Sequence, residues 1–496
     1  MSDAQEIHEL FSSHGSGFGG EHKYKDHQLA YVNLIGGATV ASGQSTLKWS
    51  FQDIKKQWLS LARGWISVPI TVTSGATNFS AVPVLAVKQS LLSLIDRVRI
   101  TRVSGEELVN ESGIHLSSNL KLLLENNPEY LSAIAAQLQY AKDEPTLDAI
   151  GGMQSDATLT NPQTLDATSA ILAVAGGAAT PASNQPLTKN VNYNVGFMRR
   201  RQHMLNNTLN DTATPGYSAT SVAFTANIPL QFIHDWFLQM GFPIFNLNIE
   251  IEMTFNVAGF GYSPFCYGTQ PAGAVEASAG GVVSPYAVSL TTGTQPRLYY
   301  HKVKMSSDDE IKAVKLVESG YSKTISYSHH RVKDIAALAA DGDQDREVLT
   351  DAVNAKRVWV LANTSSALMK SNSWPSPVVT GPLGLRNANI FVRDVRYFDQ
   401  NLNTLEQQWK ALQEQFPQVD GPDAGPLTYA EFVQRYRILC FDISRTKDFI
   451  DAEAASVIRV SGSVTADCNL TFIVEEVKKA VYSFDGNGLS MVVRAA

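Results

Sequence analysis

The sequence predicts an all-β protein with short helices, built from two tandem eight-stranded antiparallel jelly rolls (a double jelly roll) with long loop insertions. Three observations support this class. Segments in which apolar and polar residues alternate recur from one end of the chain to the other. The pattern starts over beyond residue 320, which divides these segments into two runs. An apolar helix interrupts each run.

Composition and charge narrow the class further. The 496 residues are enough for two or three compact units, and 44% hydrophobic with 18% charged residues is a globular composition. The net charge of -7 argues against a general basic surface that coats nucleic acid. The cysteines are far apart and odd in number, which predicts neither a disulfide framework nor a zinc site, and we expect Cys440 and Cys468 to be buried thiols.

The N-terminal residues and the apolar segments do not predict targeting to a membrane. Residues 1–10 are polar and acidic, so we expect no secretory signal. No segment approaches the roughly 18–20 apolar residues that a membrane-spanning helix needs.

The most regular segment of the first run lies between Ile228 and Phe255. Pro229 can open a helix because a first-turn residue needs no backbone donor, and Phe232, Trp236 and Met240 then share one face. After a stop at 241–243, strict alternation over 247–255 predicts a strand with one buried and one wet face.

Further elements of the first run have simple signals. Segments 46–51 and 65–73 are strand-like, and Pro69 predicts that the second is an edge or bulged strand. Segment 97–100 alternates charged and aliphatic residues. Residues 120–142 predict a helix broken at Asn127–Pro128.

The second run contains strand-like segments and one well-capped helix. Thr404 with Gln407 predicts a capping box for the helix 405–416. The strand-like segments are 323–327, 357–361, 390–398, 436–443, 457–464, 470–484 and 489–493.

Composition shifts set the expected domain boundaries. Segments 143–190 and 261–295 are rich in small and polar residues, which predicts an insertion and a loop. Ser307 and Glu310 predict a short helix that ends at Gly320. We therefore expect a flexible arm at 1–30, a first jelly roll at 31–306, a linker helix at 307–320 and a second jelly roll at 321–496.

Candidate ligand-binding motifs mostly fail on context. The glycine-rich segment 15–20 contains GxGxxG without a preceding strand, so a flexible arm is the better interpretation. Segment 341–347 alternates carboxylates like a calcium loop, but Arg346 and Ala352 occupy the positions where that loop needs glycine and glutamate. A solvated acidic loop is the better interpretation, and the basic run 199–201 is expected at a solvated or subunit-contact surface.

Candidate catalytic and metal-binding residues fail in the same way. His329 and His330 should point to opposite faces of a strand and so not share a metal. His234 and Asp235 are expected on a polar helix face. Glu250 and Glu252 are expected on the wet side of their strand. We therefore predict no catalytic, cofactor-binding or metal-binding residues and no enzymatic activity.

The segment Ile228–Phe232, followed by Pro243–Leu247 and the alternating strand, resembles a part of the first barrel of double jelly-roll major capsid proteins from virophages, polinton-like viruses and nucleocytoplasmic large DNA viruses. Segments 298–303, 318–323 and 474–493 are also similar to the corresponding parts of polinton-like and virophage capsid proteins. The residues expected to carry the structural motif are Pro229, Phe232, Trp236, Pro243 and Asn246.

This resemblance implies a major capsid protein of a double-stranded DNA virus. Such a subunit forms homotrimeric, pseudo-hexameric capsomers that tile an icosahedral shell, so the expected location is the virion, after synthesis and assembly inside the host cell. The implied partners are two further copies of the chain, neighbouring capsomers, penton and minor capsid proteins, and an internal membrane as a further candidate. The insertion 143–190 would build the outer crown, and no sequence-specific contact with nucleic acid is implied.

Two other function classes stay open. A carbohydrate-binding jelly roll should carry aromatic and acidic clusters on its loops, and the long loops here are poor in both. Another self-assembling surface protein could use the same sandwich, because fold alone does not fix function.

Overall fold

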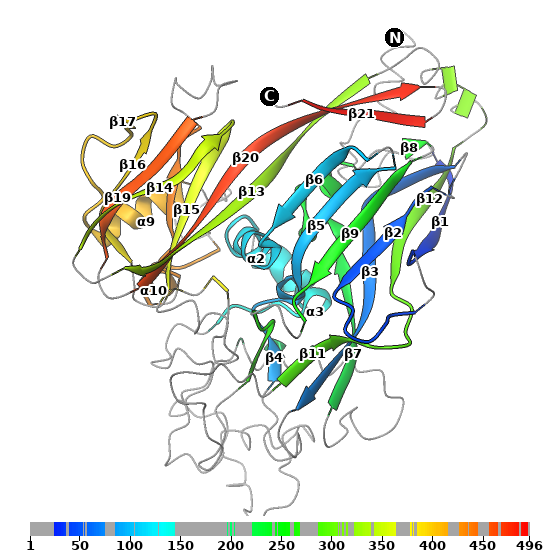
Figure 1. Cartoon of the computed structure of the whole chain (residues 1–496), viewed down its shortest axis with the longest axis horizontal. Helices are drawn as coiled ribbons and strands as arrows, with labels where there is room; N and C mark the ends of the chain where they lie inside the picture. Colours follow the sequence, from blue (N-terminus) through cyan, green and yellow to red (C-terminus); the bar gives the residue numbers. More distant parts are fainter. Residues whose placement is uncertain are drawn as a thin grey trace, which may run out of the picture.

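A computed structural model of the chain shows two β-sandwiches with helices between them (Figure 1). The structure describes residues 24–35, 39–52, 54, 57–74, 85–103, 105–126, 128–143, 196, 199–200, 203, 221–240, 244–245, 247–257, 262–267, 286–305, 307, 310–311, 314–315, 322–338, 342–363, 377–378, 380, 384–414, 426–434, 436–444, 456–464, 468–485 and 488–494.

The first sandwich packs two antiparallel sheets against each other. One sheet has the order β1 (Tyr24–Asn33), β12 (Arg297–Met305), β3 (Trp58–Ser74) and β7 (Ser221–Pro229), with β8 (Ile244–Phe245) and β11 (Tyr286–Leu290) also paired to β3. The other has the order β2 (Thr46–Ser50), β9 (Ile249–Phe255), β5 (Ile95–Arg102) and β6 (Glu107–Ser112). A short pair, β4 (Leu85–Val87) with β10 (Phe265–Tyr267), lies beside them.

The second sandwich repeats this arrangement. Its first sheet has the order β13 (Ser322–Leu338), β20 (Cys468–Asp485), β15 (Ala355–Asn363) and β18 (Leu439–Asp442), with β21 (Gly488–Arg494) added to β20. Its second sheet has the order β14 (Asp343–Ala352), β19 (Ser456–Val464), β16 (Leu385–Val392) and β17 (Val395–Arg396).

Both sandwiches have the strand order of a jelly roll. When the main strands of each are counted along the chain, one sheet holds the first, eighth, third and sixth, and the other holds the second, seventh, fourth and fifth. The predicted fold class is therefore confirmed, and the duplication lies in the topology of the chain.

The alternation seen in the sequence is what builds these cores. In β9, every second side chain from Ile249 to Phe255 is buried, and the intervening ones are half-buried. The predicted helix break is also present, since α2 (Ile114–Leu124) ends before α3 (Pro128–Leu138) begins. Cys440 and Cys468 are buried, as expected.

Two local expectations about the first roll are wrong. The single helix expected after Pro229 is two short helices, α5 (Leu230–Ile233) and α6 (Asp235–Gln239), because His234 between them is extended at φ -154°. β3 is also a central strand and not an edge strand, although it contains Pro69; the bulged alternative is not contradicted, since the pairing of β3 with β12 has a register shift between Tyr299 and His301. The proline is tolerated because it lies in a gap between two partners on one side of β3. The first residue of β12, Arg297, pairs with Ser67, and the last residue of β11, Leu290, pairs with Ile70.

Several expected loops and boundaries also differ. The acidic segment 341–347 is mostly strand, since β14 begins at Asp343 and pairs with β19. β10 and β11 lie inside the segment 261–295, and β1 begins at Tyr24, inside the expected arm. Residues 1–23 and 144–195 lie outside the described residues. The described residues of 307–315 are helical.

The two rolls share apolar contacts along what we call the junction. β13 and β20 are 17 and 18 residues long and extend past the second roll to cover one side of the first (Figure 1). The buried residues Ile325, Tyr327, Ala480 and Tyr482 belong to the core of the first roll. One face of α2 packs on the second roll in a separate cluster that includes Trp359, Leu361 and Ile473.

Further short helices among the described residues include the 3-10 helix η1 (Leu91–Leu94), α9 (Leu405–Gln413), which has the predicted Thr404–Gln407 capping box, and α10 (Tyr429–Gln434). In the part of the chain that the structure describes, none of the helices has the length and hydropathy to cross a bilayer.

Candidate functional site at the junction

The polar part of the junction lies along the free edge of β13. β13 is the outer strand of its sheet, so alternate backbone N–H groups point away from β20. Two carboxylates of the first roll accept these groups: Asp235 Oδ2 accepts from Ser328 N at 3.0 Å, and Glu111 Oε2 accepts from His330 N at 2.8 Å. The first roll therefore caps a sheet edge that would otherwise be open to pairing with another strand.

Glu111 of β6 is surrounded by three imidazoles, and we call these four residues the histidine cluster. The side chain of Glu111 is 2% exposed. His234 Nε2 and His329 Nδ1 lie 3.1 and 3.4 Å from its Oε2, and His330 Nδ1 lies 3.2 Å from its Oε1. Burial would raise the pKa of Glu111, but the imidazoles of His330 and His234 hold that pKa well below its ordinary value.

The position of the proton on His234 follows from its other contact. His234 is the N-cap of α6, and its Nδ1 accepts a hydrogen bond of 3.0 Å from the backbone N–H of Trp236. A neutral imidazole has one N–H and one acceptor nitrogen, so the proton of His234 is on Nε2, which faces Glu111. The ring therefore links the start of α6 to the buried carboxylate.

A metal ion is the obvious alternative for this cluster. Glu111, His234 and His329 each offer a ligand atom within 4.8 Å of the other two. Two of these separations, 3.1 and 3.4 Å, are near the roughly 3.3 Å between ligands of a tetrahedral zinc ion. However, a ligating histidine normally donates through its other nitrogen, whereas His234 accepts there. The cluster therefore fits a carboxylate with imidazole donors better than a cation site.

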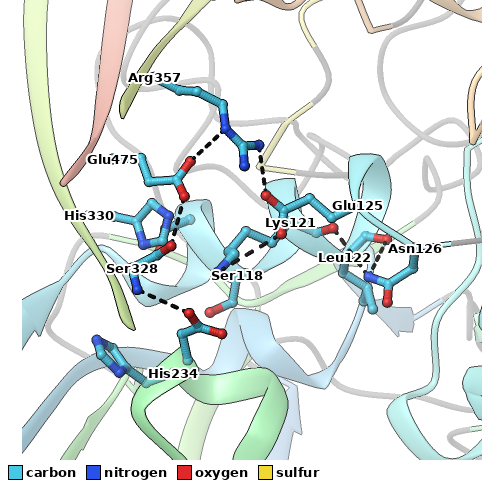
Figure 2. Close-up of polar contacts among 12 residues, drawn as sticks. Ser118, Lys121, Leu122, Glu125, Asn126, His234, Ser328, His330, Arg357 and Glu475 are labelled. Atoms are coloured by element: carbon cyan, nitrogen blue, oxygen red, sulfur yellow. Dashed lines mark hydrogen bonds and ion pairs between the residues drawn. The ribbon is translucent and has the colours of Figure 1, made fainter. Parts of the chain in front are cut away.

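A second polar chain runs beside the cluster and also joins the rolls (Figure 2). Arg357 of β15 bridges Glu475 of β20 at 3.1 Å and Glu125, next to α2, at 2.9 Å. Ser328 Oγ donates to Glu475 Oε1 at 2.7 Å. Burial would raise the pKa of Glu475, but the charge of Arg357 holds it below the ordinary value.

A cavity of about 320 Å³ opens next to the cluster, and its lining includes Glu111, Tyr130, Phe232 and Leu238. Serine hydroxyls near this cavity are the candidate nucleophiles. The hydroxyl of Ser118 donates to the Ile233 carbonyl, and those of Ser117 and Ser328 donate to carboxylates. Within the described part of this site, these hydroxyls are committed to acceptors other than histidine, which is not the arrangement of an activated serine. The bonds of Ser117 and Ser118 lie within the first roll and that of Ser328 lies within the second, so all three hydroxyls have a structural role.

Three residues of the predicted structural motif are described, and they lie on the first-roll side of the junction. Pro229 ends β7 and precedes α5, Phe232 is half-buried with its ring 6.2 Å from that of Tyr130, and Trp236 is fully buried. Pro243 and Asn246 lie outside the described residues.

Three interpretations of polar residues need correction. His234 is 4% exposed and does not lie on a polar helix face. His329 and His330 both reach Glu111, because this carboxylate lies against the edge of β13, where side chains from either face can approach it. Arg200 of the basic run is also buried, and its guanidinium binds Asp143 at 2.7 Å.

Sequence reasoning missed Glu111 as a site residue. The signal in the sequence was local, since Glu111 follows Leu108 and Val109 and a carboxylate that continues an apolar strand needs partners; the structure buries all three residues. Glu250, by contrast, behaves as expected on the wet face of β9, where it pairs with Lys48.

Comparisons with known proteins agree with this architecture. No protein-family model and no curated protein matches the sequence. Among solved structures, the chain is similar to one from the Sputnik virophage, with 11% identity and a TM-score of 0.58 over 96% of this chain and 89% of that one. It is also similar to the mavirus major capsid protein, with 11% identity and a TM-score of 0.53 over 94% of this chain and 90% of that one. At this identity the likeness shows the fold, and the expected resemblance is confirmed at that level.

Proposed function

We propose that the chain is the major capsid protein of a double-stranded DNA virus and has a structural rather than an enzymatic role. In this proposal three copies form a pseudo-hexameric capsomer, and capsomers tile an icosahedral shell. Its partners are then further copies of the chain, neighbouring capsomers, and penton and minor capsid proteins, with an internal membrane as a further candidate. Its location is the virion.

The observation that carries the proposal is the repetition of one strand order in two rolls that are joined side by side. Each chain therefore presents two similar bodies in a fixed relation. Three such chains around a three-fold axis place six similar bodies in a ring, and a near-hexagonal unit of this kind can tile a surface.

The comparisons support the same conclusion. The mavirus protein is a major capsid protein, and the similarity covers nearly the full length of both chains, so both rolls and their junction are included. The junction contacts described above hold the two rolls against each other, as a ring of six would need.

The proposal is tested by the mass and outline of the purified chain. Light scattering should give a mass near three times 54.0 kDa, and negative-stain images should show particles with a hexagonal outline. A stable monomer would contradict the proposal and favour the carbohydrate-binding or other surface-protein classes, which a glycan-binding screen would then separate.

A further inference from the structure

We propose that the junction is an acid-sensitive joint: protonation of the histidine cluster weakens the attachment of β13 to the first roll. This inference concerns contacts within one chain and does not depend on the proposed function.

The first argument is the number of donors on one carboxylate. Glu111 accepts from Ser117 Oγ at 3.0 Å and from His330 N at 2.8 Å, in addition to its contacts with the three imidazoles. If one imidazole of the cluster is protonated, its positive charge can be balanced by Glu111. If a second imidazole is protonated, its charge is buried without a partner, which is costly.

The second argument is the hydrogen bond that His234 already accepts. Another proton on this ring must go to Nδ1, where it would oppose the N–H of Trp236 at 3.0 Å. Loss of this bond removes the N-cap of α6. The first residue of α6 is Asp235, which accepts the Ser328 N–H, so the second attachment of β13 is disturbed with the first.

The charged groups around the cluster do not supply the missing negative charge. Glu475 is paired with Arg357, Glu476 lies 3.5 Å from Arg331, and the charge of Asp235 acts on Lys121, whose pKa it helps to raise. Among the described residues, the titratable and charged groups that face the cluster are Glu107 on β6, Lys121 on α2, Asp235 on α6, Tyr327 and Arg331 on β13, Arg357 on β15, and Glu475, Glu476 and Lys478 on β20.

The direction of the pH dependence follows from His329 and Glu111. Burial lowers the pKa of His329 and outweighs the attraction of Glu111. Since the pKa of His329 in the folded chain lies below the ordinary value near 6.5, the stabilisation that neutral His329 contributes is present above about pH 6.5. It is lost as the pH falls below that value. The pKa of Glu111 is also lowered, so its own contribution is lost only below about pH 4.5. The joint should therefore respond between these values.

Hydrogen exchange of β13 is the direct test on the full chain. After correction for the intrinsic pH dependence of exchange, protection of peptides within 322–338 should fall between pH 7.5 and 5.5. For each group that titrates, the equilibrium constant for opening changes by up to about tenfold per pH unit. Peptides from β14 and β19, which belong to the other sheet of the second roll, should keep their protection. Unchanged protection of β13, or an equal loss of protection in β14 and β19, would overturn the proposal.

Variants isolate the histidines. His234→Asn keeps an N-cap residue but cannot titrate, and combining it with His329→Gln should flatten the pH dependence of β13 exchange. The matched control is His115→Gln, which removes an imidazole 3.5 Å from Asp96 within the first roll and should leave the wild-type pH dependence unchanged. If the double variant keeps the wild-type dependence, the cluster is not the sensor and the proposal fails.

Discussion

The junction has an apolar part and a polar part, and one strand contributes to both. Ile325 and Tyr327 of β13 are buried in the core of the first roll. Directly after Tyr327, Ser328 and His330 donate their backbone N–H groups to Asp235 and Glu111. The apolar contact depends on the area removed from water, which pH does not change. The polar contact depends on the protonation of a few side chains, so it can fix the register of β13 and can also release it.

Glycine at position 113 shows how closely the two rolls approach. Gly113 has a φ of 75°, and a Cβ there would lie 2.8 Å from Val332 Cγ2 of β13. The turn from β6 into α2 therefore needs glycine both for its backbone conformation and for the contact with the second roll.

The largest expected effect is in the apolar part. Trp236→Ala removes a fully buried indole from the first-roll core beside the junction. Unfolding by urea should show a loss of about 3–5 kcal/mol, the usual cost of such a truncation. The loss should be the same at pH 7.5 and pH 6, because no titrating group is removed.

The matched control for this substitution is Leu238→Ala in the same helix. Leu238 is 49% exposed, so its truncation should change the free energy of unfolding by less than about 0.5 kcal/mol. Equal losses for the two variants would mean that α6 does not pack as the structure shows.

The second prediction addresses the polar part. Glu111→Ala leaves three imidazoles and the His330 N–H without their buried acceptor. Removing one partner of a buried ionic contact costs about 3–5 kcal/mol, to be measured by urea unfolding at pH 7.5. In contrast to Trp236→Ala, this loss should shrink at pH 5, where wild type has already lost part of the contact.

Glu107→Ala is the control on the same strand. Glu107 pairs with Arg99 at 2.8 Å, but both side chains are about two-fifths exposed, at 40% and 39%. Its removal should cost no more than about 1 kcal/mol. A cost near that of Glu111→Ala would show that burial does not set the difference between the two carboxylates.

The sequence predicts the fold well because its signals are local. Alternation from Ile249 to Phe255 and the break at Pro128 both act through neighbouring residues, and both predictions are confirmed. Pro69 misled because its effect depends on the partner strand, which changes from β12 to β11 at that point. No local pattern contains that information.

The site was harder to predict because it is assembled from distant segments. Glu111, His234 and His329 come from β6, from the break between α5 and α6, and from β13. The helix break itself depends on His234, whose ring caps α6 instead of facing solvent. Each residue alone has an ordinary interpretation, and only the position of β13 at the edge of its sheet brings them together.

The third prediction tests whether a polar contact of the junction that contains no histidine depends on pH. Tyr327 lies at the junction, and its hydroxyl donates to the Leu108 carbonyl at 3.0 Å. Tyr327→Phe should cost about 1 kcal/mol in urea unfolding. Burial raises the pKa of Tyr327 to about 12, so its contribution is fully present below about pH 10. The loss should therefore be constant from pH 5 to 8, and a loss that varied over this range would contradict the assignment of the acid response to the histidines.

The smallest effect is expected for a short ion pair outside the junction. Lys48 Nζ lies 2.7 Å from Glu250 Oε2, closer than any imidazole nitrogen lies to Glu111, but the two side chains are 41% and 22% exposed. Lys48→Ala should cost about 0–1 kcal/mol, and the difference should vanish in urea unfolding at high salt. Water and salt weaken this pair, whereas the side chain of Glu111 is only 2% exposed and accepts hydrogen bonds from Ser117 and His330. A loss as large as that of Glu111→Ala would mean that distance, and not burial, decides which charges matter in this chain.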